Sequence, residues 1–434
     1  MQLEAAIVLV ILFFFMLAMS VPVSFSIIAS SLVTIIMFLS PDFGMFISAQ
    51  KIVSGIDSFT LLAVPFFILA GQLMSSGGIA KRLINFAMLF LGRVPGSLAL
   101  TNIAGNAMFG SLSGSGIAAV TAIGGVMNPL EKEAGYDEAF SAATNIATGP
   151  VGQLIPPTNA FIVFSAASGG VSVATLFMAG WIPGLLWAGL CMVVAFFYAK
   201  KHGYVVKRDK LTAKIVLKTI WDAIPSLFLI VIIIGGILSG KFTATEASGV
   251  AVVYAFILSV FIYRSIKLSD MKQILVNAGV MTTIVMLIIG ASSVLSFVLS
   301  FTGLPQAISE LMLGISSNKI VILLMINVIL LIVGTFMDMA PALLIFTPIF
   351  LPVIRSIGMD PIHFGVMMVM NLSIGTITPP VGSVLFVGCS VANLKVEAVV
   401  KKLMPYFVAI IIALLLVTFI PAISTWLPGV LGLM

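Results

Sequence analysis

The chain has 434 residues, of which 61% are hydrophobic and 8% are charged, and its mean hydropathy is +1.25. No water-soluble surface can be built from this composition, so the chain is expected to be an integral membrane protein. Its apolar segments have helical length and lack the alternation of apolar and polar residues that barrel strands need, which predicts an all-α fold.

Twelve apolar segments follow one another along the chain, six on each side of a basic stretch at residues 203–219. The first segment follows Glu4 without a positive flank or a small-residue cleavage site, so we interpret it as a spanning helix and not as a signal peptide. We interpret the basic stretch as a linker. In chain order the apolar segments are 5–19, 21–39, 58–76, 98–130, 139–167 and 176–199, then 224–240, 244–263, 278–300, 321–353, 361–390 and 404–424.

Two Pro-Pro pairs interrupt uncharged stretches, where each pair must break a membrane helix. The first lies in "IPPTN" (155–159) and the second in "ITPPVG" (377–382), with the pairs 223 residues apart. Four more Pro, Gly and Asp positions coincide at this offset, and the segment boundaries agree, so the sequence predicts a tandem repeat. Its parts are a first copy at 1–202, the linker at 203–219 and a second copy at 220–434.

The basic residues are unevenly distributed. Seventeen of the 21 lie in five hydrophilic connections, the longest of which is "KKHGYVVKRDKLTAKIVLK" at residues 200–218. Positive charge concentrates in cytoplasmic loops, so these connections are expected inside the cell and both termini outside, in the periplasm. The first copy then begins outside and the second inside, which gives inverted repeats, a transporter architecture. The net positive charge of the chain is explained by these connections, which orient the protein in the membrane. It therefore gives no reason to expect nucleic acid as a partner.

Each copy contains one long apolar segment whose middle is interrupted by small, polar or helix-breaking residues. These segments are 98–130, with "GSLSGSGIAA" in its middle, and 321–353, with "GTFMDMAPAL". The charge distribution requires each segment to begin and end on one side of the membrane, so both are expected to be re-entrant hairpins. The segments 139–167 and 361–390 hold the Pro pairs and are expected to be broken helices. Irregular backbone at this depth is tolerated only where it is buried in protein or lines a cavity, so hairpin tips and breaks should meet near the midplane.

Unwound carbonyl groups suit a cation such as Na⁺, and helix N-termini suit a carboxylate. Small residues at these places also favour close helix packing, and polar side chains can satisfy backbone groups freed by proline, so a structural role is the alternative for each. The candidate Na⁺ ligands are Ser111, Gly114, Gly149, Gly152, Thr335, Asp338, Gly375 and Thr376. The candidate substrate-binding residues are Ser113, Ser115, Gln153, Thr158, Asn159 and Thr378.

Asp338 is the only acidic or basic residue that the sequence places deep in the membrane. A carboxylate there costs about 2.5–3.5 kcal/mol on insertion scales, so a bound Na⁺ or a proton is expected to offset it. The alternative is a helix cap at the hairpin turn, because Asp is a favoured N-cap and Pro341 follows.

No enzymatic site is visible. The stretch "GGILSGKF" (235–242) nearly matches a phosphate-binding loop, but Phe242 stands where the Mg²⁺-binding Ser or Thr belongs. His202 and His363 are expected on opposite sides of the membrane, which excludes a histidine dyad or metal cluster. The chain is therefore not expected to be an enzyme.

Several short motifs occur together across the whole chain. They are the tip "GSLSGSGIAAVTAIG", the turn "LEKEAGYD", the breaks "GQLIPPTN" and "GTITPPVG", and the opening "KFTATEASG" of the second copy. In this combination the chain resembles the large, DctM-like membrane subunit of tripartite ATP-independent periplasmic (TRAP) transporters. The resemblance implies Na⁺-coupled uptake of a small organic acid, such as sialic acid or a C4-dicarboxylate, by an elevator motion of the hairpin domain in the bacterial inner membrane.

The resemblance also implies two protein partners. One is a small membrane subunit, expected as a separate polypeptide because no additional four-helix segment is present, and the other is a periplasmic substrate-binding protein. The expected scaffold, roughly residues 1–76 and 224–264, carries Phe13, Phe14, Phe15, Phe228 and Phe256, which suit contact with a membrane protein or with lipid. Two alternatives remain: a self-sufficient Na⁺/carboxylate symporter of similar architecture, and a passive pore.

Overall fold

The computed structural model describes residues 2–204 and 212–434, and every regular element in this part of the chain is a helix. Eight helices in the described residues are long and apolar enough to cross a membrane. The predicted all-α membrane fold is therefore confirmed. These eight are Phe59–Ser76, Val173–His202, Ala213–Leu238, Ala244–Ile262, Leu268–Thr302, Lys319–Phe336, Met339–Ser356 and Val396–Phe419.

The first half of the chain forms α1 to α10. In order, the elements are α1 (Gln2–Ala18), α2 (Val23–Phe38), α3 (Pro41–Ile56), η1 (Phe59–Leu62), α4 (Ala63–Ser76), α5 (Ile79–Leu91), α6 (Ser97–Ser113), α7 (Gly116–Glu133), α8 (Glu138–Thr148), η2 (Gly149–Gln153), α9 (Asn159–Ala167) and α10 (Val173–His202).

The second half forms α11 to α20. In order, the elements are α11 (Ala213–Leu238), α12 (Ala244–Phe256), η3 (Ile257–Ile262), η4 (Leu268–Asp270), α13 (Met271–Thr302), α14 (Leu304–Ile315), α15 (Lys319–Phe336), α16 (Met339–Ser356), α17 (Pro361–Gly375), α18 (Ser383–Ala392), α19 (Val396–Phe419) and α20 (Ala422–Val430).

The basic linker that the sequence predicts differs from the structure at its C-terminal end. Residues 205–211 lie outside the described part of the chain. Residues 213–219, however, form the first two turns of α11, where Lys214 and Lys218 are spaced four apart. A helix can leave the apolar layer without unwinding, because its backbone hydrogen bonds are internal. The basic stretch therefore includes the start of α11.

Most elements of the two halves correspond, although the long α13 covers the positions that match α4 and part of α3, and α20 has no counterpart in the described part of the first half. Helices α7 and α16 both have 18 residues, and their first residues, Gly116 and Met339, are 223 positions apart. Helices α10 and α19 begin at Val173 and Val396, at the same offset. Both Pro-Pro peptide bonds, Pro156-Pro157 and Pro379-Pro380, are cis. The offset read from the proline pairs thus also relates the helices around them.

Each expected hairpin is a pair of helices joined by a two-residue turn. Helix α6 ends at Ser113, Gly114 takes the left-handed conformation with φ of 62°, and the Ser115 hydroxyl caps α7 by accepting a hydrogen bond from the Ala118 amide. A left-handed residue without a β-carbon allows the chain to reverse this sharply. In the second copy, Met337 and Asp338 join α15 to α16 in extended conformations.

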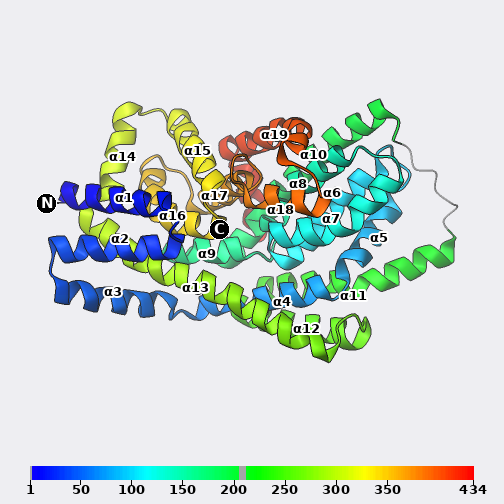
Figure 1. Cartoon of the computed structure of the whole chain (residues 1–434), viewed down its shortest axis with the longest axis horizontal. Coiled ribbons are helices and arrows are strands. Elements are labelled where there is room, and N and C mark those ends of the chain that lie inside the picture. The colour runs from blue at the N-terminus through cyan, green and yellow to red at the C-terminus, as the bar shows by residue number, and fades with distance from the viewer. Residues whose placement is uncertain (1, 205–211) are drawn as a thin grey trace.

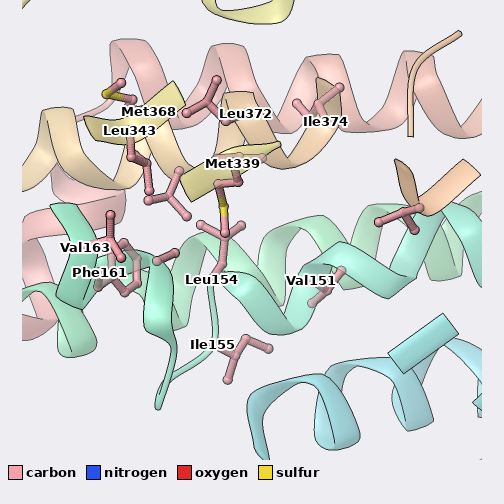
Figure 2. Close-up of a cluster of buried hydrophobic side chains, with 14 of the residues drawn as sticks. Val151, Leu154, Ile155, Phe161, Val163, Met339, Leu343, Met368, Leu372 and Ile374 are labelled. Atoms are coloured by element: carbon pink, nitrogen blue, oxygen red, sulfur yellow. The ribbon is translucent and has the colours of Figure 1, made fainter. Parts of the chain in front are cut away.

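The halves interlock through their hairpins and broken helices. Helix α7 of the first half packs against α18 of the second, and α9 packs against α16. Figure 2 shows the resulting core, in which side chains of the first break, such as Leu154, share a buried cluster with Met339 and Leu372 of the second half. Because each broken helix is covered by the other half, its irregular backbone is shielded from lipid.

Four shorter helices, α3, α5, α14 and α20, were not among the expected segments. Helices α5 and α14 each precede a hairpin and are amphipathic, with polar residues such as Lys81 and Glu310 between apolar ones. A search of the sequence for uncharged apolar stretches does not detect amphipathic helices of this kind. Figure 1 shows α14 at the end of the molecule that holds the N-terminus and α5 at the opposite end, as inverted copies require.

An ion pair joins the halves at the start of α8. The Asp137 carboxylate caps α8 by accepting from the amides of Ala139 and Phe140. Lys402 Nζ of α19 lies 2.7 Å from Asp137 Oδ2 and donates to the Tyr198 hydroxyl at 2.7 Å. Partial burial alone would raise the pKa of Asp137, but the hydrogen bond from Lys402, the two capping amides and the lysine charge together lower it.

Replacing Lys402 with Met should lower thermal stability in detergent at neutral pH, by about 1 kcal/mol or less because the pair is partly exposed. The folded-state pKa of Asp137 is lowered, so the stability that the pair contributes is present above its ordinary value of 3.8 and is lost as the pH falls through the folded-state pKa. The difference between the two proteins, measured by thermal unfolding, should shrink on acidification. Lys401→Met is the control, and an equal effect of that change would contradict the prediction.

Candidate functional site

A pocket of about 360 Å³ lies where the two hairpin tips meet. The tip of the first hairpin contributes Ser113, Gly114 and Ser115, and the tip of the second contributes Asp338 and the residues after it. Ser113 and Asp338 are 225 positions apart in the chain, and the structure places both on one cavity. A pocket of this size falls within the range of small-molecule sites. Its other polar lining residues are Gln72, Ser75, Thr121, Gln153, Asn159, Thr376 and Ser383.

Four helix N-termini converge on this pocket. Helices α7, α9, α16 and α18 all begin beside it, and each contributes a lining residue from its first turn or its cap. The unpaired amides at a helix N-terminus carry partial positive charge, which favours a bound anion. The residues at these four starts are Ser115, Asn159, Asp338 and Ser383.

Asp338 is the only charged residue among those that line the pocket, and no Lys, Arg or His lines it. It stands at the N-cap position of α16, which the first copy fills with Ser115 in front of α7. The Ser115 hydroxyl makes the capping hydrogen bond, whereas the Asp338 side chain makes none. Its polar neighbours are the Met339 amide and the Ser383 hydroxyl. A capping role therefore does not explain this carboxylate.

Two other lining residues have unused acceptors. Gln153 Oε1 and Asn159 Oδ1 are buried and have no hydrogen-bond partner. They lie at the two ends of the first break, since Gln153 ends η2 and Asn159 begins α9. Buried polar atoms are nearly always satisfied, so these two oxygens require a partner that the protein itself does not supply.

Seven of the candidate site residues do not line the pocket, and the hydroxyl of an eighth, Thr376, is bonded within its own helix turn. The hydroxyls of Ser111, Thr335, Thr376 and Thr378 each donate to a backbone carbonyl three or four residues earlier. The Thr158 hydroxyl caps α9 by accepting from the Ala160 amide. Of these five, only Thr376 lines the pocket. The other three are Gly149, Gly152 and Gly375.

These three glycines lie at close backbone contacts. A β-carbon on Gly152 would overlap the backbone of Gly110 in α6, and one on Gly375 would overlap the backbone of Gly334 in α15. A β-carbon on Gly149 would overlap the Val120 side chain of α7. Each break is thus pressed against its own hairpin. The structural alternative accounts for these glycines, and their role as carbonyl ligands of Na⁺ stays a prediction.

The sequence did not predict the remaining wall of the pocket. It is formed by α4, with Ile68, Gly71, Gln72 and Ser75, and by the apolar face of α13, with Met281, Ile284, Val285 and Ile288. A β-carbon on Gly71 would lie 3.1 Å from the Ser113 carbonyl oxygen, so α4 touches the first tip directly. The segments 58–76 and 278–300 occupy equivalent positions in the two copies. This equivalence was the feature of the sequence from which a shared position beside the site could have been predicted.

The structure also contains a second acidic residue inside the protein. Glu131 near the end of α7 is fully buried in the protein, which the sequence did not lead us to expect, whereas the expectation that Asp338 alone lies deep in the membrane stays a prediction. In the sequence Glu131 stands beside Lys132 and Glu133 and resembles part of a solvated turn. Packing of α6 and α8 against α7 covers it.

A larger cavity of about 610 Å³ lies elsewhere, between the starts of α15 and α17 and the end of α19. Lys319, Asp360 and His363 are among its lining residues, and none of the candidate site residues is. The helix starts beside it, those of α15 and α17, lie away from the hairpin tips and the Pro-Pro breaks. The pocket at the tips is therefore the better candidate for the functional site.

Comparison with known proteins identifies the family. Residues 10–423 match the model of the DctM component of the tripartite ATP-independent periplasmic transporter. The chain belongs to this family.

Curated relatives agree with this assignment. The C4-dicarboxylate TRAP transporter large permease protein DctM of Pseudomonas aeruginosa is 38% identical over 93% of the chain and 94% of the relative. The uncharacterized protein YgiK of Salmonella typhimurium is 49% identical over 96% of the chain and 95% of the relative. Since the TRAP family is one of transporters, its large permeases are not enzymes, as expected for this chain.

A solved structure supports the fold of this TRAP permease. The YdaH transporter of Alcanivorax borkumensis superposes with a TM-score of 0.64, covering 88% of the chain and 89% of the YdaH chain. The sequence identity is 13%, so the likeness concerns the fold alone. It agrees with the arrangement of hairpins and broken helices described above.

Replacing Gly152 with Ala should displace the first hairpin from its break, because the added methyl group would overlap the Gly110 backbone. Overpacking of this kind destabilises by about 1–3 kcal/mol. Thermal unfolding and transport should both be impaired. The matched control is Gly189→Ala in α10, where a β-carbon meets nothing within 4 Å. Wild-type stability of the Gly152 variant would show that the break is not held this closely.

Proposed function

We propose that this TRAP large permease carries out secondary active, Na⁺-coupled import of a small organic acid. The observation that supports the proposal is the charge balance of the pocket: four helix N-termini, one carboxylate and no basic side chain. Such a site attracts an anion through helix ends, yet it needs mobile cations to neutralise both the anion and Asp338.

The electrostatic argument concerns two negative charges in one small cavity. A bound carboxylate and an ionised Asp338 would repel each other more strongly here than in water, because protein surrounds them. Each helix N-terminus offers only about half an elementary charge of compensation, and that within its first turn. Bound Na⁺ would supply the missing positive charge. Substrate binding and Na⁺ binding would then favour each other, which is the thermodynamic basis of symport.

The donors present fit Na⁺, which prefers oxygen ligands. The tips offer the backbone carbonyls around Gly114, the Asp338 carboxylate and the hydroxyls of Ser113 and Ser115, while the breaks offer the carbonyls freed by the Pro pairs. The unsatisfied oxygens of Gln153 and Asn159 point to the same need. The described residues contain no group of three or more His, Cys, Asp or Glu suited to a transition metal.

The proposed substrate is a small acid such as a C4-dicarboxylate or sialic acid. A relative named for C4-dicarboxylate supports the first of these. In this proposal, the acid group lies at the helix N-termini, and the rest of the molecule faces α4 and α13. Alternating access would follow from an elevator motion of the hairpins and broken helices along these two helices, with Gly71 as the point of closest contact.

The family implies a small membrane subunit and a periplasmic substrate-binding protein. We propose that the small subunit covers the outer face of α1 and α11, where Phe14, Phe15 and Phe228 are half or more exposed. We further propose that both chain termini lie in the periplasm, because 17 of the 21 basic residues lie in the connections assigned to the other side of the membrane. The alternative function is a self-sufficient Na⁺/carboxylate symporter, which the same pocket would serve.

Replacing Asp338 with Asn should abolish or strongly reduce Na⁺-driven uptake, because the variant lacks the charge that holds the cation. The fold should be kept, since Asp338 makes no capping bond. Uptake into proteoliposomes under an inward Na⁺ gradient measures the effect, and Glu310→Gln in the amphipathic α14 is the control. Wild-type uptake by the Asp338 variant at every Na⁺ concentration would contradict the ion site.

Uptake should require the substrate-binding protein. The purified chain and its small subunit in liposomes should take up free substrate poorly under an inward Na⁺ gradient, and addition of the loaded binding protein should restore uptake. The reason is that a tripartite transporter receives its substrate from the docked binding protein. Robust uptake of free substrate without it would favour the self-sufficient symporter.

A further inference from the structure

Glu131 is a buried acid that the proposed transport site does not use. Its exposed fraction is 0%, and it lies in the last turns of α7, at the end of the first hairpin remote from the pocket. Asn102 Nδ2 of α6 donates to Glu131 Oε1 at 3.3 Å. The Ser141 hydroxyl of α8 lies beside the carboxyl and is its second polar neighbour.

A buried polar track leads from Glu131 to the first break. Asn106 Nδ2 donates to Asn102 Oδ1 and to Asn145 Oδ1, each at 2.9 Å, and lies 3.1 Å from Thr148 Oγ1. Asn145 Nδ2 donates to the Val120 carbonyl of α7 at 2.9 Å. Thr148 directly precedes η2, which is the first break. The track therefore connects α6, α7 and α8 from the base of the hairpin to the helix break.

The fold does not need this acid. The second copy has Ile354 at the position that corresponds to Glu131, and Met325, Ile329 and Met368 at those of Asn102, Asn106 and Asn145. It keeps one buried amide pair, in which Asn371 Nδ2 donates to Asn327 Oδ1 at 2.7 Å, but no carboxyl. The same helix arrangement is thus built with an aliphatic residue where the first copy has Glu131. A buried acid is less favourable than such a residue, so its presence indicates a function.

The surroundings of Glu131 favour the neutral acid. The lysines near the hairpin base have other partners, Lys132 with Glu138 and Lys402 with Asp137. Within the described residues, no Lys, Arg or His is paired with Glu131. A carboxylate here would be desolvated with only the neutral groups of Asn102 and Ser141 beside it, whereas the protonated acid carries no net charge.

The other groups that face Glu131 do not neutralise it either. The titratable groups in electrostatic range are the phenols of Tyr136 and Tyr406. Of the remaining elements packed against α7, η2 and α6 bring no ionisable side chain and α18 brings only Cys389. Helix α5 brings Lys81 and Arg82, and the Arg82 guanidinium stacks on the Tyr263 ring at 3.6 Å.

We propose that Glu131 is a proton-binding site, and that release of its proton loosens the polar track that holds the first hairpin to the broken helix. The protonated acid lies in the packed core without charge, and its carbonyl oxygen accepts from Asn102. Loss of the proton to water leaves a buried carboxylate that has only the neutral groups of Asn102 and Ser141 beside it and, within the described part of the chain, no cation. The hairpin base must then open to admit water, and the α6, α7 and α8 contacts weaken. The packing of this copy consequently depends on pH.

The test uses the purified full chain in detergent, without substrate or Na⁺, so that its outcome is separate from the transport proposal. Infrared spectra should show a protonated carboxyl band at neutral pH that is absent in Glu131→Gln and unchanged in the control Glu133→Gln, since Glu133 is exposed on the same helix. Thermal stability of the wild type should fall between about pH 5 and pH 9 relative to Glu131→Gln, which mimics the neutral acid at every pH.

A second variant keeps the test decisive if Glu131→Gln fails to fold. Asn102→Leu removes the donor that favours the carboxylate, so the infrared titration of the acid band should move to higher pH by about one unit. A neutral-pH spectrum in which neither Glu131→Gln nor Asn102→Leu alters a carboxyl band would overturn the proposal. Parallel pH dependence of stability in the wild type and Glu131→Gln would also overturn it.

Discussion

The constraint on which this structure depends is that backbone polar groups inside a membrane must find partners within the protein. A continuous helix meets it alone, but a break at Pro156-Pro157 or Pro379-Pro380 does not. The interlocked copies resolve this, because α9 is covered by α16 and α7 by α18. Two irregular stretches that neither copy could hold alone are therefore stable together. The pocket is the space that remains between them.

Close packing of the breaks determines what the pocket can contain. Gly152 and Gly375 press the breaks onto the hairpins, so the free helix ends face the tips instead of lipid. The protein thereby concentrates partial positive charge on one cavity without a basic side chain. A lysine or arginine there would bind an anion in a fixed way. In the proposed Na⁺-coupled mechanism, helix ends together with a mobile cation would allow binding that varies with the ion gradient.

Much of this arrangement could be predicted from the sequence because it follows from backbone chemistry. Proline pairs must break helices, and glycine permits the turn at Gly114. A carboxylate such as Asp338 in an apolar run is energetically costly, which marks it as a functional candidate. These signals located both hairpins, both breaks and the two tips that line the pocket. These signals depend only on residues close together in the sequence, so they can be recognised without knowledge of tertiary contacts.

The parts that could not be predicted depend on tertiary packing. Gln72 and Ser75 belong to the site only because α4 lies against the first tip, and nothing in their own segment shows this. Glu131 has charged neighbours in sequence, yet α6 and α8 bury it. Amphipathic helices such as α5 lack the uniform apolar run used to find spans. The roles of the candidate ligands stay predictions, since bonded hydroxyls such as that of Thr378 serve the helix equally well.

The two copies share a backbone but differ in where they hold an acid. At the N-cap of the second helix of each hairpin, the first copy has Ser115, which caps, and the second has Asp338, which does not. Near the end of the same helices, the first copy has Glu131 and the second has Ile354. Symmetric packing would be satisfied by a serine and an isoleucine in both. Each departure from symmetry therefore adds an acid that the fold does not need, one facing the pocket and the other buried at the base of the first hairpin. An inverted repeat supplies the scaffold twice, and these single acids are where the two halves differ chemically, so the proposed cation site and the proposed proton site belong to different copies.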